Sequence, residues 1–255
     1  MSGIDSFTTL MLHCDTTPFI DDSLIPSSVS TTGTGVSVDN SIYVFGNGAY
    51  KVVSTSATPS FLFVTNTGVT AFAASNFTFN FRFYCTDTNN FDVFFMQEDT
   101  ITGGNTLNIY RNSPSISSGR TFFIVSSAGT YHTRYYSDIV ISPNTWYTYA
   151  FVRDSSDIRF YVNGNTQSVV VTSAIGTNVM PNIAGDLQFG RNSYNNNVLG
   201  MWMDEIRISN TLRYTGNYTV ETTAFSFVPV ILEESRKRMS RLSYDNMMDY
   251  MMEDY

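Results

Sequence analysis

The chain has 255 residues, of which only 14% are charged, and its formal net charge is −8 at pH 7. A chain this acidic, with few Lys and Arg residues, is unsuited to bind nucleic acid or an anionic membrane surface. No apolar run reaches the 18 residues that would cross a bilayer. Phe, Tyr, Thr, Val, Ser and Asn dominate the composition, which is typical of strands joined by polar turns and, at this length, of one all-β domain.

The first 15 residues, MSGIDSFTTLMLHCD, contain no basic segment followed by an apolar one. No secretion signal is therefore recognisable, and assembly in a cytoplasm is expected. Cys14 and Cys85 fall in predicted strands and are expected to be buried free thiols that behave as small apolar side chains.

Strand patterns recur along the chain, and clusters of Gly, Asn, Ser and Pro separate them at the spacing of a β-sandwich or barrel. The pattern FTFNFRFYC at 77–85 places four Phe residues on one face. Asn163-Gly164 predicts a type I′ hairpin, whereas the Ser/Thr-rich stretch 16–40 is expected to be a surface excursion. We therefore predict two antiparallel sheets packed face to face. The expected strands are 9–14, 42–45, 50–53, 77–85, 91–97, 106–110, 121–125, 146–153, 158–163, 167–172, 186–189 and 200–208.

The stretch MWMDEIRIS at 201–209 predicts a strand with an acidic residue, Asp204, on its apolar face. Strict alternation along a strand places Asp204 on the same face as Trp202 and Ile206. It directs Glu205 and Arg207 to the opposite face, where we expect solvent. An inward carboxylate needs a hydrogen-bond, ionic or metal partner.

The composition changes near residue 230, so we divide the chain into a sandwich domain, 1–230, and an amphipathic C-terminal segment, 231–255. One stripe of a predicted short helix collects Met and Tyr side chains at i, i+3, i+4 and i+7 spacing. Such a stripe indicates a docking or anchoring segment. The residues expected to bind a partner are Arg236, Lys237, Arg238, Tyr244, Met247, Met248, Met251, Met252 and Tyr255.

Six stretches, in this order and spacing, resemble the concanavalin A-like, laminin-G/pentraxin-like jelly-roll domains, and they span about residues 9 to 227. The stretches are TLMLHCD (9–15), FGNGAYKVV (45–53), FTFNFRFY (77–84), NTWYTYAFVRDSSDIRFYVNGN (144–165), LQFGRNS (187–193) and LGMWMDEIRISNTLRYTGNYTV (199–220). The ending DEIRISNTLRYTGNYTVETTAF is similar to the version of this domain in structural proteins of tailed bacteriophages. The resemblance implies a lectin-like sandwich on a virion, as a capsid decoration, tail or fibre component.

Relatives of this architecture include glycoside hydrolases, which need two carboxylates that flank the scissile bond. Glu98 and Asp99 are adjacent and would point to opposite faces of a strand, so we expect no enzyme activity. The two histidines, His13 and His132, are isolated in the sequence. We expect His13 to be a partly exposed structural residue.

The resemblance also implies a structural calcium where the first and last strands meet, and Asp15 and Asp204 are the candidate ligands. The alternative is that Asp204 accepts backbone N–H groups or pairs with an arginine such as Arg82 or Arg213.

Glycan binding needs aromatic platforms with convergent polar groups. The predicted loops offer Tyr131, Tyr135, Tyr136, Tyr194 and the Asn run 195–197, without singling out any residue.

The function expected first is that of a non-enzymatic virion structural protein of a tailed phage, assembled in the host cytoplasm. It would contact other capsid or tail proteins through the C-terminal segment and would form a homo-oligomer. The alternative is a carbohydrate-binding adhesin that recognises host-surface glycans. Neither function involves nucleic acid or a membrane.

Overall fold

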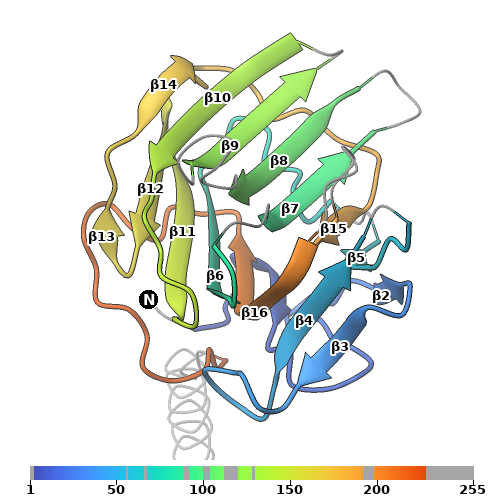
Figure 1. Cartoon of the computed structure of the whole chain (residues 1–255). Helices are drawn as coiled ribbons and strands as arrows, with labels where there is room; N and C mark the ends of the chain where they lie inside the picture. The colour runs from blue at the N-terminus through green and yellow to red at the C-terminus, as the bar shows by residue number, and fades with distance from the viewer. Residues whose placement is uncertain are drawn as a thin grey trace, which may run out of the picture.

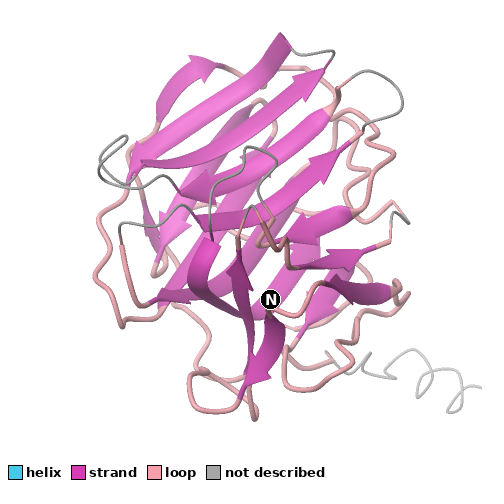
Figure 2. Ribbon diagram, turned by 45° about the vertical axis from the view of Figure 1, so that its right-hand side comes forward, coloured by secondary structure: helices cyan, strands magenta, loops and turns pink. Residues whose placement is uncertain are grey.

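The computed structural model describes residues 3–55, 57–65, 68–88, 92–99, 104–111, 120–127, 130–191 and 198–227. These residues form two eight-stranded antiparallel sheets in two layers (Figures 1 and 2). The first sheet has the order β13-β12-β11-β6-β16-β4-β3, with β1 also beside β16. Its strands are β1 (Thr8–Leu12), β3 (Val36–Asp39), β4 (Ala49–Ser54), β6 (Phe77–Cys85), β11 (Tyr147–Asp154), β12 (Asp157–Val162), β13 (Asn165–Thr166) and β16 (Val198–Ser209).

The second sheet has the order β14-β10-β9-β8-β7-β15-β5-β2. Its strands are β2 (Val29–Thr32), β5 (Phe61–Val64), β7 (Asp92–Glu98), β8 (Thr106–Arg111), β9 (Arg120–Ser127), β10 (Thr130–Asp138), β14 (Val170–Ser173) and β15 (Leu187–Phe189). The predicted all-β sandwich is confirmed. The short helix expected within 231–255 lies outside the described residues, as does the proposed domain boundary at 230.

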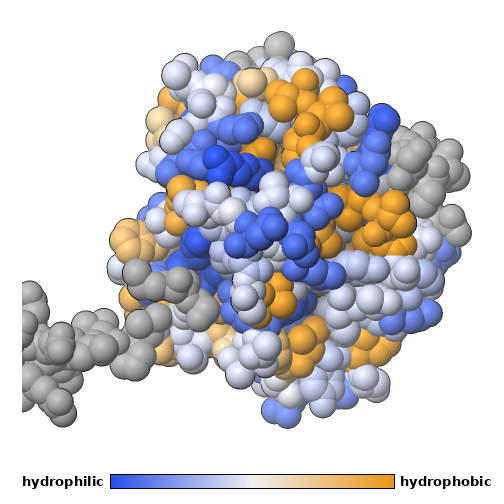
Figure 3. Space-filling view, turned by 90° about the vertical axis from the view of Figure 1, so that its left-hand side faces the viewer, coloured by the Kyte–Doolittle hydropathy of each residue, from blue (hydrophilic) through white to orange (hydrophobic). Residues whose placement is uncertain are grey.

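The surface on the side shown in Figure 3 is mainly polar, with apolar patches separated from one another. Val170 and Val171 of β14, an edge strand of the second sheet, are 49% and 47% exposed. Scattered apolar side chains of this kind are normal on a folded domain. The described residues contain no α-helix long and apolar enough to span a bilayer.

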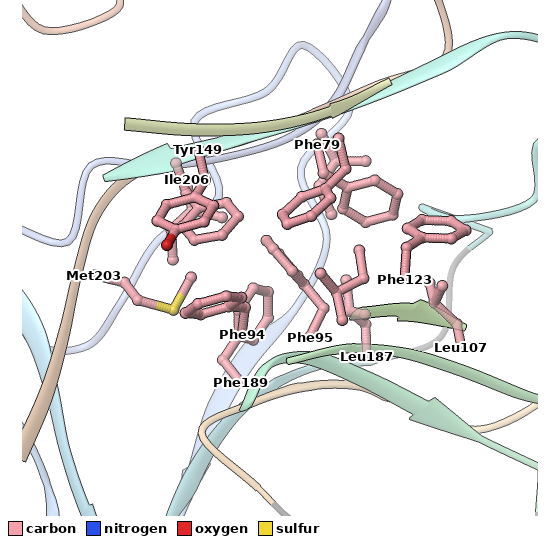
Figure 4. Close-up of a cluster of buried hydrophobic side chains, with 14 of the residues drawn as sticks. Phe79, Phe94, Phe95, Leu107, Phe123, Tyr149, Leu187, Phe189, Met203 and Ile206 are labelled. Carbon is pink, nitrogen blue, oxygen red and sulfur yellow. The ribbon is translucent and has the colours of Figure 1, made fainter. Parts of the chain in front are cut away.

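The core lies between the sheets and is rich in aromatic side chains (Figure 4). The four inward Phe residues of β6 have no exposed surface, as the alternation in 77–85 predicted. The Phe81 ring lies 5.0 Å from that of Phe94 and 5.1 Å from that of Phe95, both on β7 of the opposite sheet. Cys14 and Cys85 are buried free thiols, as expected.

Strand β16 occupies a central position, because it pairs with β6 on one side and with β4 and then β1 on the other. Its pairing with β6 shifts register between Asp204 and Arg207, and Glu205 has a positive φ of 50°. This is a β-bulge, in which two residues of β16 face one residue of β6. Met203 before the bulge and Ile206 after it both enter the core.

The bulge overturns the strict alternation expected for 201–209. Trp202 and Asp204 lie on the outer face of the first sheet, opposite to Met203. Glu205 and Arg207 were expected in solvent, yet they are 2% and 0% exposed. Alternation was predicted from a regular strand, and the extra residue changes which positions face inward.

A segment that follows β16 covers part of this outer face, and we name residues 210–227 the covering segment. It is the orange trace that runs past β11 to β13 in Figure 1. Tyr214 and Tyr218 stack with ring centroids 3.6 Å apart, and Tyr214 packs against Val152 and Tyr161. The covered part of the outer face is therefore a second, smaller apolar interface rather than a solvated surface.

Several strand predictions need correction. The segment 42–45 is a loop, and the predicted surface excursion 16–40 contains β2 and β3. Both are edge strands, and their short Ser- and Thr-rich sequences conceal the strand pattern. Strands β5 and β10 were also missed. Asn163 and Gly164 both have positive φ, as a type I′ turn requires, but β13 is only two residues long and the chain then crosses to β14 in the other sheet.

Phe81→Ala is expected to lower the free energy of unfolding by about 3–5 kcal/mol, because it removes a buried ring and leaves a cavity. Urea denaturation measures this change. Val140, which is 89% exposed, is the control, and Val140→Ala should change the free energy by less than about 0.5 kcal/mol. Equal effects of the two substitutions would contradict the packing of Phe81 against Phe94 and Phe95.

Candidate functional site

Asp204 has no exposed surface, and backbone N–H groups surround its carboxylate. Oδ2 accepts hydrogen bonds from Val44 N at 2.8 Å and Phe45 N at 3.2 Å, and Oδ1 accepts one from Glu205 N at 2.8 Å. The alternative that Asp204 accepts backbone N–H groups is thus confirmed. Asp204 fastens β16 to the loop before β4, and not to the first strand.

Asp15 binds the same loop a few residues further on. Its Oδ1 accepts from Asn47 N at 2.7 Å and from Gly48 N at 3.2 Å. A Cβ at Gly46, which has a φ of 66°, would lie 2.1 Å from Asp15 Oδ1. Only glycine therefore lets the loop approach the carboxylate so closely.

The two arginines suggested as partners of Asp204 bind elsewhere. Arg82 lies opposite Asp204 in the sheet, but its guanidinium donates to Thr148 Oγ1 and to the Glu221 carbonyl. Arg213 pairs with Asp5 at 2.7 Å. Arginine pairing of Asp204 was therefore wrong.

The calcium prediction concerns the same two acids. Three amide N–H groups already bind the carboxyl oxygens of Asp204, and their positive ends would repel a cation. Within the described residues, no group of three or more His, Cys, Asp and Glu side chains is placed to hold a metal ion. Backbone amides therefore hold the Asp204 side chain, and calcium binding by Asp15 and Asp204 stays a prediction.

Glu205 connects β16 to the residue after β1 and to the covering segment. Its Oε1 lies 2.7 Å from His13 Nδ1, and its Oε2 accepts a hydrogen bond from Phe225 N at 2.7 Å. The hydrogen bond to Glu205 raises the pKa of His13. The expected role of His13, a partly exposed structural histidine, is confirmed.

Arg207 is fully buried beneath the covering segment. Its guanidinium lies 3.8 Å from the Phe225 ring centroid and donates to Tyr214 Oη at 3.1 Å and to the Gly3 carbonyl at 3.3 Å. Glu221 lies 3.9 Å away and supplies a counter-charge. The covering segment is thus fixed by polar groups of β16 as well as by apolar packing.

The part of the outer face beside the N-terminal half of β16 carries a different group of side chains. Trp146, Tyr84 and Trp202 form a continuous series that we name the aromatic row. Tyr84 lies opposite Trp202 in the sheet, and the ring centroids are 5.3 Å apart for Tyr84 and Trp146 and 5.4 Å apart for Tyr84 and Trp202. Tyr84 and Trp146 are half-buried, whereas Trp202 is only 4% exposed. The row contains both tryptophans of the chain.

Polar groups border the aromatic row at both ends. Asn144 is exposed and accepts a hydrogen bond from Tyr84 Oη at 3.1 Å. Lys51 Nζ lies 4.8 Å from the Trp202 ring centroid. Asp39 Oδ2 accepts from Trp202 Nε1 at 3.0 Å and from Lys51 at 3.2 Å. This arrangement offers aromatic surface together with hydrogen-bonding groups.

The sequence did not identify this row. The alternation in β6 predicted correctly that Tyr84 points outward, but the bulge in β16 obscured the position of Trp202. Among the tyrosines suggested for glycan binding, Tyr135 is buried in the core, whereas Tyr136 is half-buried beneath Arg120 on the second sheet. The side chains of Tyr131 and His132, and residues 194–197, lie outside the described part of the chain.

Of the other residues that the sequence analysis named, the structure describes Glu98 and Asp99 but not the residues expected to bind a partner. Glu98 ends β7 half-buried, and the adjacent Asp99 is 2% exposed. The residues expected to bind a partner all lie outside the described residues, namely Arg236, Lys237, Arg238, Tyr244, Met247, Met248, Met251, Met252 and Tyr255.

Comparison with protein families gives one match. The family model Laminin_G_3, described as the concanavalin A-like lectin/glucanases superfamily, matches residues 47–215. A comparison with curated protein sequences finds no match.

The chain is also similar to solved structures of botulinum neurotoxin binding domains. It matches that of serotype C1 with 15% identity and a TM-score of 0.61, over 82% of this chain and 49% of that chain. It matches neurotoxin DC in complex with SialylT with 16% identity and a TM-score of 0.61, over 82% and 49%. It matches neurotoxin DC in complex with rat synaptotagmin II with 16% identity and a TM-score of 0.62, over 83% of this chain and 50% of that chain. The likeness shows the fold, and this chain spans about half the length of those domains.

Asp204→Ala is expected to lower the free energy of unfolding by about 2–4 kcal/mol, because it leaves buried N–H groups without an acceptor. The melting temperature should fall by roughly 5–15 °C. Asp138→Ala is the control, because the Asp138 pair with Arg120 is exposed and should contribute less than about 1 kcal/mol.

EDTA should leave the melting temperature of the unaltered protein unchanged. A chelator-sensitive melting temperature that Asp204→Ala abolishes would instead establish the calcium site.

The pH dependence of stability tests the charge state of Asp204. Burial raises the pKa of Asp204 to about 7, and the amides of Val44 and Phe45 offset part of that increase. Between the unfolded pKa of about 4 and this value, the native state holds a proton that the unfolded state has released, so the free energy of unfolding falls as pH rises. The pKa of His13 is also raised, so the free energy of unfolding continues to fall as the pH rises above 6.5.

Urea denaturation at intervals from pH 4 to pH 8 measures this slope. Asp204→Asn should flatten it between pH 4 and 7, and His13→Gln should flatten it only at the upper end. A slope that Asp204→Asn leaves unchanged would show that Asp204 is ionised throughout this range.

Proposed function

The chain belongs to the concanavalin A-like lectin/glucanases superfamily, and we propose that it is a non-enzymatic carbohydrate-binding module that uses the aromatic row. The observation that carries the proposal is the half-buried pair Tyr84 and Trp146, with the exposed amide of Asn144 beside it. A sugar ring has apolar C–H faces and a rim of hydroxyl groups. It therefore suits an aromatic surface bordered by hydrogen-bonding side chains.

The aromatic row is fixed in place before any ligand binds. Tyr84 lies on β6 and Trp202 on β16, two neighbouring central strands of the first sheet. Asp39 holds the indole N–H of Trp202, and Lys51 lies over its ring. Side chains already held in one conformation lose less entropy on binding, which favours affinity.

The solved structures support the class of ligand. One similar binding domain was solved with SialylT, and another is from botulinum neurotoxin type C, whose cell entry depends on interaction with two ganglioside molecules. Because this chain spans about half of those domains, they support carbohydrate binding in general. They do not identify the sugar bound here.

We also propose that the module does not hydrolyse the glycan that it binds. Glycosidases place two carboxylates on opposite sides of one scissile bond. The aromatic row has Asp39 as its neighbouring acid, and this carboxylate is already engaged by Trp202 and Lys51. Glu98 and Asp99, the only pair that the sequence suggested, belong to the end of β7 in the other sheet.

A virion location also stays part of the proposal. It rests on the resemblance of residues 204–225 to structural proteins of tailed phages, and a carbohydrate-binding surface on a particle would act as a host-recognition adhesin. The geometry supports the binding role directly, whereas capsid, tail and fibre positions are all compatible with it.

A glycan array probed with the full-length protein tests the function. We expect at least one glycan class to bind, and Trp146→Ala to weaken that binding about tenfold or more, the loss that removal of one aromatic anchor causes. Trp146→Phe should retain part of the affinity because an aromatic face remains.

The control for this experiment is Phe61→Ala, which removes a half-buried aromatic side chain from the second sheet. It should leave glycan binding unchanged. The bound glycan, after prolonged incubation with the protein, should show no new reducing ends. Absence of binding across the array, or binding that Trp146→Ala does not alter, would refute the proposal.

A further inference from the structure

Two large apolar side chains project from the loop between β1 and β2. Leu24 is 53% exposed and Ile25 is 86% exposed. Together with Pro26 they form one wall of a groove of about 400 Å³, which we name the apolar groove. Thr9, Val69 and Asn210 contribute to the rest of its lining. Unlike isolated apolar side chains on a surface, these line a concave site, the form in which one surface receives another.

The loop that carries these side chains is held firmly in this position. The buried carboxylate of Asp21 accepts hydrogen bonds from Met11 N and Ser23 N, both at 2.9 Å, and from Ser27 N at 2.7 Å. Ser23 Oγ also donates to the Ile25 carbonyl at 3.1 Å. Leu24 and Ile25 are therefore directed outward by a fixed backbone.

The chain leaves the described structure close to this groove. Ile4 and Phe227 form a parallel β-bridge, and Ile4 N donates to the Ser226 carbonyl at 2.8 Å. Phe227 is 54% exposed. Ser6 and Thr8, which follow Ile4 by a few residues, line the groove. The segment 228–255 thus begins on the side of the molecule where the groove lies.

We propose that the apolar groove is the docking site of the Met and Tyr stripe of the same chain, from Tyr244 to Tyr255. The stripe presents Met247, Met248, Met251 and Met252 at helical spacing, and methionine side chains adapt well to irregular apolar surfaces. Amphipathic segments commonly bind in an apolar groove through side chains at i, i+3, i+4 and i+7.

The length of the chain is sufficient for this contact. Residues 228–243 separate Phe227 from the stripe and, fully extended, would reach about 50 Å. A stripe connected to its own sandwich by this linker is present at a high effective concentration, which favours docking within one chain over docking onto another. The proposal is independent of sugar binding, because the groove and the aromatic row share no residue.

Photo-cross-linking of the full-length protein tests the contact. Ile25 is replaced by p-benzoylphenylalanine, which its exposure allows without loss of folding, and the cross-linked peptide is identified by mass spectrometry. We expect cross-links to residues 244–255 within a monomer. The double substitution Met247→Asp and Met251→Asp should lower their yield about tenfold, because it places charges in an apolar contact.

The matched control carries the same photo-reactive residue at Val140, which is 89% exposed and does not line the groove. It should give no cross-link to 244–255. Equal yields at the two positions, or cross-links from position 25 only to other segments, would overturn the proposal. Cross-links that join an isotope-labelled chain to an unlabelled one would overturn docking within one chain, because they would show exchange between copies.

Discussion

The β-bulge at Glu205 is the constraint on which the organisation of the first sheet depends. One extra residue in β16 allows Met203 and Ile206 both to enter the core. It also places the carboxylates of Asp204 and Glu205 next to each other on the outer side. From there Asp204 holds the loop before β4, and Glu205 holds His13 and the backbone of Phe225. Without the bulge, half of the strand would turn its apolar side chains away from the core.

Several charged side chains of this fold are held by backbone groups. Asp204, Asp15 and Asp21 each accept at least two amide hydrogen bonds from a loop. Arg153 shows the opposite case, because it is 1% exposed and donates to the carbonyls of Ala73, Ser155, Gly176 and Asn178. A buried charge held in this way fixes the shape of a loop that has little regular structure. The positions of the loops around the sheets therefore depend on a few buried side chains.

The outer face of the first sheet is divided between two uses. The covering segment closes the part near the C-terminal half of β16 through Tyr214, Phe225 and their contacts with Arg207. The aromatic row occupies the part near the N-terminal half of the same strand, where Tyr84 and Trp146 retain exposed surface. Tyr84 and Trp202 lie on neighbouring central strands. Regular strands hold the side chains of a binding surface more precisely than loops do.

Local alternation and turn chemistry were enough to predict the fold class, the inward Phe row of β6, the turn at Asn163-Gly164 and the burial of both cysteines. The sequence also indicated that Asp204 must have a partner. Three outcomes could not be predicted in this way. The partner of Asp204 is a loop 160 residues earlier in the chain, Glu205 and Arg207 are buried, and Trp202 joins Tyr84 and Trp146 in one row. These outcomes depend on a bulge and on pairings between distant strands, and the energy of such contacts is set by neighbours that a local pattern does not contain.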